Sequence, residues 1–143
     1  MVIVDANVLL HAVNDESPSH AVAYVWLERA LDGAEAVGLA WVALLAFIRI
    51  STRTGIFPRP LEPGDAVAVV EGWISRPSAV VVEPTPRHAS ILRGLLEDAG
   101  TAGNLTSDAH LAALALEHRA EIVSFDRDFQ RFVGLRSRVP VVH

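Results

Sequence analysis

Short runs of β-favouring apolar residues alternate with longer segments of helical periodicity along the whole sequence. This alternation is typical of a parallel sheet, because each parallel strand needs a long return connection, which a helix supplies. We therefore predict an α/β fold with three layers, α/β/α, around a central and mainly parallel sheet. The expected strands are residues 2–4, 36–39, 80–83, 122–124 and 139–142. The expected helices are residues 7–13, 18–31, 41–52, 65–75, 86–98 and 108–119, of which 41–52 is apolar on nearly every side and should lie in the core.

Length and composition narrow the class of protein. A chain of 143 residues is long enough for one domain and short for two, so we expect a single domain over residues 1–143. The absence of cysteine excludes disulfides, thiol catalysis and cysteine-based zinc sites. The longest uncharged apolar run, residues 36–48, is shorter than the ~20 residues that span a membrane. With no export signal in the sequence either, we expect a cytoplasmic protein without membrane contact.

The basic residues of the sequence are of one type. The net charge of −5 does not by itself indicate nucleic-acid binding, but all 12 basic residues are arginine. A guanidinium is a flat, permanently charged fork that suits phosphate. Four of these arginines cluster near the 53–65 loop and the segment after residue 124, namely Arg53, Arg59, Arg127 and Arg131. This pattern fits an acidic metal centre that is flanked by phosphate contacts.

Carboxylates directly follow two of the expected strands. Asp5 comes straight after residues 2–4, where burial of an uncompensated charge would cost several kcal/mol. Asp126 and Asp128 follow the strand 122–124 in the same way. Ligands of open parallel sheets bind beyond the carboxyl ends of the strands. These acids should therefore meet at one edge if the two strands are parallel neighbours.

A further acid, Asp108, stands in the first turn of the expected helix 108–119. Residues 108, 111, 112 and 115 share one helical face, and the last three are Leu, Ala and Ala. The helix dipole favours an acid in a first turn by ~0.3–1 kcal/mol, but it does not require that acid to lie on the inward face. We therefore group Asp108 with Asp5 and Asp126.

Three carboxylates at one edge repel one another, and each has a raised pKa unless a cation is present. Mg²⁺ or Mn²⁺ relieves this repulsion, because hard cations prefer carboxylate oxygens and keep several waters. A divalent ion in such a site polarises a phosphoryl oxygen and activates water for in-line attack on a phosphodiester. The acids therefore indicate metal-dependent hydrolysis.

Three segments carry a resemblance through their order and spacing: "DANVLL" after the first strand, "DAHLAALALEH" on a late helix and "SFDRDF" after a late strand. Together they resemble PIN-domain ribonucleases, especially the VapC type, which are toxins of bacterial type II toxin–antitoxin pairs. The resemblance covers essentially the whole chain. It implies a parallel α/β/α fold and a Mg²⁺- or Mn²⁺-dependent endoribonuclease that acts on RNA. It also implies a cognate antitoxin that blocks the site, and frequent homodimers.

The resemblance also assigns roles by motif. It implies that Asp5, Asp108 and Asp126 are the catalytic acids that bind the metal. It implies that Asn7 and Ser124 orient ligands or water, and it makes Asp128 a candidate outer acid.

The sequence departs from the family at one position. Members usually carry a Glu on the central helix just before a "FLRV"-like segment, whereas this segment reads "LLAFIRIST" and the matching residue is Ala46. With three acids in place of four, we expect one tightly held ion, with any second ion recruited by RNA phosphate. Asp128 and Glu16 are candidate substitutes for the missing acid. Arg49 lies three residues after Ala46 on the same helical face, and with Arg127 it is a candidate contact for RNA phosphate.

Ala46 also motivates an alternative, a catalytically weak or silent PIN-like module that binds RNA or protein. A Mg²⁺-dependent phosphatase or receiver is less well supported, because "DANVLL" lacks the second Asp that an aspartate nucleophile needs two residues on. Among the other side chains, we interpret His110 and His118 as surface histidines without partners. We interpret Phe129 and Phe132 as core residues.

Overall fold

A sheet of parallel strands forms the centre of the protein, whose computed structural model describes residues 1–142. The strands are β1 Val2–Val4, β2 Val37–Leu39, β3 Ala79–Val81, β4 Glu121–Val123 and β5 Ser137–Arg138. Their order in the sheet is β3-β2-β1-β4-β5, and every neighbouring pair is parallel. The strands β1 and β4, which precede the predicted acids, are therefore parallel neighbours at the centre.

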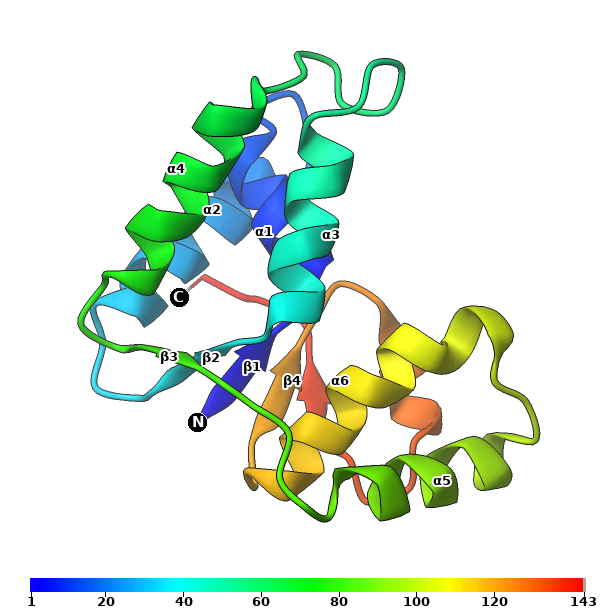
Figure 1. Ribbon diagram of the computed structural model, residues 1–143. Helices are drawn as coiled ribbons and strands as arrows, with labels where there is room; N and C mark the ends of the chain where they lie inside the picture. Colours follow the sequence, from blue (N-terminus) through cyan, green and yellow to red (C-terminus); the bar gives the residue numbers. More distant parts are fainter. Residues whose placement is uncertain (143) are drawn as a thin grey trace.

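Helices cover both faces of this sheet. The α-helices are α1 Ala6–Val13, α2 His20–Leu31, α3 Trp41–Ser51, α4 Pro63–Ile74, α5 His88–Ala99 and α6 Thr106–Glu117. Two 3₁₀ turns are η1 Gly103–Leu105 and η2 Arg127–Arg131. Figure 1 shows α1 to α4 gathered on one side of the sheet and α5 with α6 on the other. The predicted three-layer α/β/α fold is therefore confirmed.

The alternation of side chains along the strands explains the two layers. Val2 and Val4 of β1 pack into a core with α1 to α4, while Ile3 between them packs into the core under α5 and α6. Ile122 and Val123 of β4 divide in the same way. Because both faces of each central strand are buried, these strands are continuous apolar runs.

The last strand differs from its prediction at residues 139–142. The observed β5 is Ser137–Arg138, which pairs with Ile122 and Val123 of β4. Since β4 ends at Val123, the chain after Arg138 has no continuing strand beside it. Pro140 also has no N–H to donate to a ladder.

Two helices also differ from the sequence-based expectation. Helix α2 begins at His20 and not at Pro18, because Ser17 forms a turn in which its Oγ accepts the Ser19 N–H at 3.1 Å. Helix α3 was expected to lie in the core on nearly every side, which is wrong for one flank. Trp41 and Leu45 are 44% and 58% exposed.

A buried polar cluster joins α5 and α6, and we call Thr85, His88, His110 and Glu117 the Glu117 cluster. The Glu117 carboxylate, which is 7% exposed as a residue, accepts the N–H and O–H of Thr85 at 2.8 and 2.6 Å. It also accepts a hydrogen bond from Nδ1 of His88. The other ring nitrogen of His88, Nε2, lies 2.8 Å from Nδ1 of His110. His110 therefore has a partner that no pattern in the sequence indicated.

The predictions for Phe129, Phe132 and His118 have different outcomes. Phe129 and Phe132 are 1% and 4% exposed in the core beneath α6, which confirms their prediction. His118 was also expected to lack a partner, but its Nε2 donates to the carbonyl oxygen of Glu83 at 2.8 Å. No helix within residues 1–142 is long and apolar enough to cross a membrane.

Candidate active site

The carboxyl ends of β1 and β4 lie side by side and place Asp5 next to Ser124. The Asp5 N–H donates to the Val123 carbonyl oxygen at 3.0 Å, which continues the ladder one residue beyond β1. Ser124 donates its hydroxyl to Oδ2 of Asp5 at 2.7 Å. The other oxygen, Oδ1, accepts the Ala6 N–H at 2.7 Å and caps α1. Asp5 therefore belongs both to the helix start and to the edge of the sheet.

Burial is the main cause that raises the pKa of Asp5 above its usual value. The hydrogen bonds from Ser124 and Ala6 act in the opposite direction, and the nearby carboxylate of Asp126 raises the pKa further. The carboxylate is thus held in place by donors, and no cationic side chain within residues 1–142 forms an ion pair with it.

Asn7 and Ser124 form a bridge between the two strand ends. Asn7 Nδ2 donates to Ser124 Oγ at 3.0 Å, and Asn7 Oδ1 accepts the Phe125 N–H at 3.1 Å. Ser124 Oγ also accepts the Asp126 N–H at 2.9 Å. The Ser124 oxygen therefore accepts two hydrogen bonds, from Asn7 and from the Asp126 N–H. The hydroxyl proton is then left to be donated to Asp5.

Asp108 reaches the same edge from the first turn of α6. Its pKa is raised to about 6, first by burial and then by the carboxylates of Asp5, Asp126 and Asp128. The guanidinium of Arg131 acts against these causes and lowers the pKa. Four acids from three parts of the chain are thus close enough for their charges to interact.

Asp126 and Asp128 differ in their surroundings. Asp126 is half-buried and caps η2, where its Oδ1 accepts the Asp128 N–H at 2.8 Å. Asp128 is exposed. Glu16, the other candidate substitute, is exposed beyond the end of α1, where its N–H donates to Asn14 Oδ1 at 3.2 Å.

A hollow of about 190 Å³ opens beside these acids, between α3 and the start of α6. Asp5, Asp108 and Arg49 supply its charged side chains, and Ala46 lies in its wall. The rest of the lining is Ala6, Val42, Ala43, Ser107 and Leu111. Position 46 therefore faces the acids, and no Glu lines this hollow within the described chain. Arg127 does not line this hollow, but it lines another of about 290 Å³ with Ser124, Asp126 and Gln130.

The side-chain type of these acids suits a divalent metal, whereas their spacing in this structure does not form a metal site. Within residues 1–142, no three His, Asp or Glu side chains are arranged closely enough to form a metal site. However, carboxylate oxygens are the ligands that Mg²⁺ and Mn²⁺ prefer. Burial first and then the neighbouring carboxylates raise the pKa of Asp108, and a bound cation would remove the repulsion among these acids. The donor set therefore fits such an ion.

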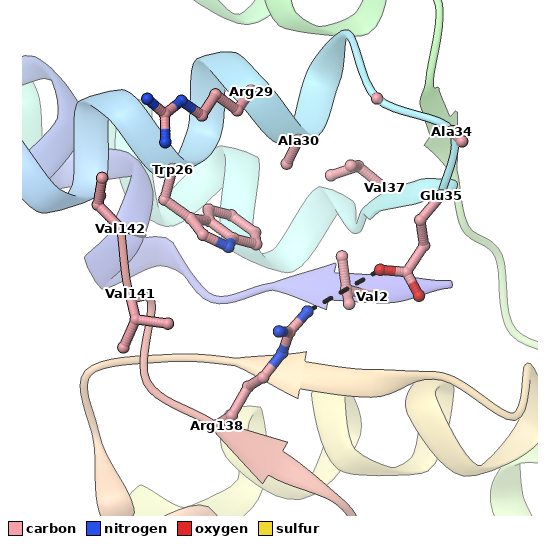
Figure 2. A pocket seen from close by; sticks show the side chains of 11 residues that line it. Val2, Trp26, Arg29, Ala30, Ala34, Glu35, Val37, Arg138, Val141 and Val142 are labelled. Carbon is pink, nitrogen blue, oxygen red and sulfur yellow. Dashed lines mark ion pairs between the residues drawn. The ribbon is translucent and has the colours of Figure 1, made fainter.

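A second hollow, of about 260 Å³, lies far from these acids at the starts of β1 and β2. Figure 2 shows Trp26 and Ala30 of α2 above Val2 and the C-terminal segment with Val141. Arg138 at its rim is paired with Glu121 at 2.9 Å and with Glu35 at 3.9 Å. These charges compensate one another, unlike those at the acid edge, so we place the candidate active site at Asp5, Asp108 and Asp126.

Sequence reasoning missed some features of this site. Ser107 lines the acid hollow, and the pairing of the Ser124 hydroxyl with Asp5 gives Ser124 a specific contact. Arg131 had been named only within a cluster of arginines, yet its charge reaches Asp108. The signals for it in the sequence were its place in that cluster and its position five residues after Asp126.

Comparisons with known proteins show the family of this chain. The model of the PIN domain family matches residues 2–135. Ribonuclease VapC37 of Mycobacterium tuberculosis is 58% identical over 136 residues, which cover 95% of this chain and 94% of that protein. Ribonuclease VapC33 of the same species is 41% identical over 141 residues, which cover 99% of each chain.

Solved structures share the fold at low sequence identity. VapBC2 from Rickettsia felis, bound to a DNA fragment from its promoter, has a TM-score of 0.72 at 16% identity and covers 98% of this chain and 99% of its own. VapC20 of Mycobacterium tuberculosis, described as a toxin that cleaves the sarcin-ricin loop, has a TM-score of 0.68 at 18% identity, with 95% and 99% covered. At these identities, the likeness establishes the fold alone.

Proposed function

Because this chain belongs to the PIN domain family and has VapC ribonucleases among its relatives, we propose that it is a divalent-metal-dependent endoribonuclease of the VapC type. Its reaction is the hydrolysis of RNA phosphodiester bonds. The observation that carries the proposal is the meeting of Asp5, Asp108 and Asp126 at one edge of the sheet, where burial and the charges of the neighbouring acids raise the pKa of Asp108 to about 6.

Each polar residue of the edge has a part in this proposal. Asp5, Asp108 and Asp126 would hold Mg²⁺ or Mn²⁺, which when bound polarises a phosphoryl oxygen and activates water for attack on phosphorus. Ser124 fixes the orientation of the Asp5 carboxylate through its 2.7 Å hydrogen bond. Asn7 holds Ser124 in turn, at 3.0 Å. Such outer contacts typically contribute 10–100-fold to metal affinity or activity.

Arg49 is the residue that we assign to the substrate in the acid hollow. It lies on α3 one turn after Ala46, and its guanidinium forms no ion pair with any described residue. A phosphate that reaches the acids would meet this charge. Since Ala46 supplies no fourth carboxylate, we propose one tightly held ion, with Asp128 as a neighbouring acid.

The partners follow from the relatives. The neighbour from Rickettsia felis is a VapBC complex, and a VapBC-1 complex from Haemophilus influenzae has a TM-score of 0.68. We therefore propose that this chain is the toxin of a toxin–antitoxin pair and that a cognate antitoxin blocks its site. The homodimer that the family resemblance implies is a separate part of the proposal.

The test is cleavage of an RNA panel that contains transfer RNA, total RNA and a sarcin-ricin loop RNA, with Mg²⁺ or Mn²⁺. The wild type should cut at least one RNA, chelation by EDTA should stop the cutting, and re-addition of the metal should restore it. Asp5→Asn should be inactive, while Asp98→Asn, which removes an exposed acid on α5, should remain active.

A wild type that cuts nothing would be followed by Ala46→Glu. Recovery of cleavage would identify a nuclease weakened at position 46. Continued failure of both proteins on the whole panel would overturn the proposed activity and leave a binding module on the same fold.

A further inference from the structure

Asp108 stands between two hollows. The first is the acid hollow with Arg49. The second, of about 400 Å³, is lined by Asp108, Asp128 and Arg131 together with Thr101, Ala102, Asn104 and Leu105. Asp108 is the one described residue that lines both. A strand of nucleic acid that passes over Asp108 would therefore meet an arginine on each side.

Arg131 is available for such a contact. It ends η2 and is exposed, and within residues 1–142 it forms no ion pair. Arg76, by contrast, is engaged, because it pairs with Glu28 at 3.0 Å and with Asp32 at 2.9 Å. Arg131 lines the second hollow together with Asp108 and Asp128, so its side chain lies beside the acid edge. Its five N–H donors have a geometry that matches phosphate oxygens.

Neutral polar groups accompany Arg131 in this second hollow. Thr101 and Asn104 are both exposed, on the turn between α5 and α6, and their side chains can hydrogen-bond to phosphate or ribose oxygens. This turn is held in shape by Gly100 and Gly103, whose φ angles are +74° and +49°. The turn and η2 thus face each other across the hollow.

We propose that Arg131, assisted by Asn104, binds a second phosphate of the RNA strand, on the side of Asp108 away from Arg49. This inference rests on the proposed function, since it concerns the same substrate. It assigns a binding role to Arg131 and leaves Arg127, which lines another hollow, outside the path of the strand. Two arginines then flank the acids, and the phosphate between them is the one presented for hydrolysis.

The alternative role of Arg131 is only to balance the charge of Asp108. The background variant Asp108→Asn separates the two roles, because it removes the main charge to be balanced and should also be unable to cleave the probe. In this background, a balancing Arg131 no longer matters for RNA binding, whereas an Arg131 that touches RNA still does.

The experiment measures the dissociation constant of a fluorescein-labelled single-stranded RNA by fluorescence anisotropy at several salt concentrations. Asp108→Asn is compared with Asp108→Asn/Arg131→Gln. The added change should weaken binding about three- to tenfold and lower the slope of log Kd against log salt by about 0.7, the value for one lost contact to a single-stranded phosphate. Asn104→Ala in the same background should weaken binding less and leave the slope unchanged.

Arg136→Gln in the same background is the matched control. Arg136 is exposed, and it lies at the opposite end of the sheet, where its carbonyl oxygen accepts the Ile122 N–H at 2.9 Å. Binding and slope should not change. An unchanged slope with Arg131→Gln, or an Asp108→Asn protein that binds no RNA at low salt, would overturn the inference. RNA binding that depends on Arg131 without wild-type cleavage would instead overturn only the proposed activity.

Discussion

The two ends of helix α6 hold acidic side chains in opposite environments. Burial raises the pKa of Glu117, but the hydrogen bonds from His88 and Thr85 outweigh it and hold the pKa below its usual range. At the other end, burial and three neighbouring carboxylates raise the pKa of Asp108 to about 6. The two acids are nine residues apart on one helix, or about 13 Å along its axis.

The difference lies in the partners and not in burial alone. Glu117 meets donors on every side and completes a network that joins α5 to α6. Asp108 meets other acids and one arginine, so its charge is left for a ligand to compensate. Repulsion among acids at one end of α6, beside a hydrogen-bonded acid at the other end, is what we expect if the first end serves binding or catalysis.

The largest expected effect is on the cleavage rate, when the acid at the Asp108 end of α6 is changed. Asp108→Asn should lower the cleavage rate by about 10³-fold, because it removes a proposed metal ligand whose ion contributes several kcal/mol to the transition state. The rate on the best RNA of the panel is the measurement, with Asp98→Asn as the control. A variant that retains a third of the wild-type rate would contradict the role of Asp108.

At the Glu117 end of α6, we expect substitutions to change the stability of the fold. Glu117→Ala leaves the Thr85 N–H, the Thr85 hydroxyl and His88 without their acceptor in a buried place. The free energy of unfolding should fall by about 3 kcal/mol, measured by urea denaturation. Glu97→Ala, which changes an exposed acid of α5, should have little effect. Equal stabilities of the two variants would show that the Glu117 cluster is not a stabilising network.

Ser124 tests both sides of this comparison, because its hydroxyl is fully hydrogen-bonded although it lies among the repelling acids. Ser124→Ala should reduce cleavage by about 10–100-fold through loss of the hydrogen bond that orients Asp5. The measurement is the rate as a function of Mg²⁺ concentration, which should show a weaker apparent affinity for the metal. Ser90→Ala on the exposed face of α5 is the control. An unchanged metal dependence would refute the orienting role.

The smallest effect is on stability without metal. The pKa of Asp108, about 6 in the folded protein, lies above its ordinary value of 3.8, so the folded state holds this proton more tightly between those values. The stabilisation is present at low pH and is lost as the pH rises from about 4 to about 6. Asp108→Asn should therefore be more stable than the wild type above pH 6 in EDTA, by about 1 kcal/mol after allowance for solvent screening.

Thermal melts of both proteins from pH 4 to pH 8 measure this difference, and 10 mM Mg²⁺ should reduce it by stabilising only the wild type. A gap that is the same at pH 4 and pH 7 would show that the carboxylate of Asp108 is not its cause.

The order of strands and helices along the chain could be predicted, because the residue patterns that indicate each element are local. Residues 2–4 and 122–124 are apolar runs followed by acids, and the carboxyl ends of parallel strands meet at one edge whatever the details of packing. The segment 139–142 has the same β-favouring residues but misled the prediction, since a strand exists only where a partner continues beside it. His110 misled it as well, because its partner His88 lies 22 residues away.

The sequence by itself determined the alternation of strands and helices, the positions of Asp5, Asp108 and Asp126 at element ends, and the Ala at position 46. Only the tertiary structure decided which side chains touch. The Ser124 hydroxyl meets Asp5 across 119 residues, and Arg131 comes near Asp108 through the docking of η2 beside α6. Such contacts depend on strand register and helix packing over the whole core, which no local pattern of residues encodes.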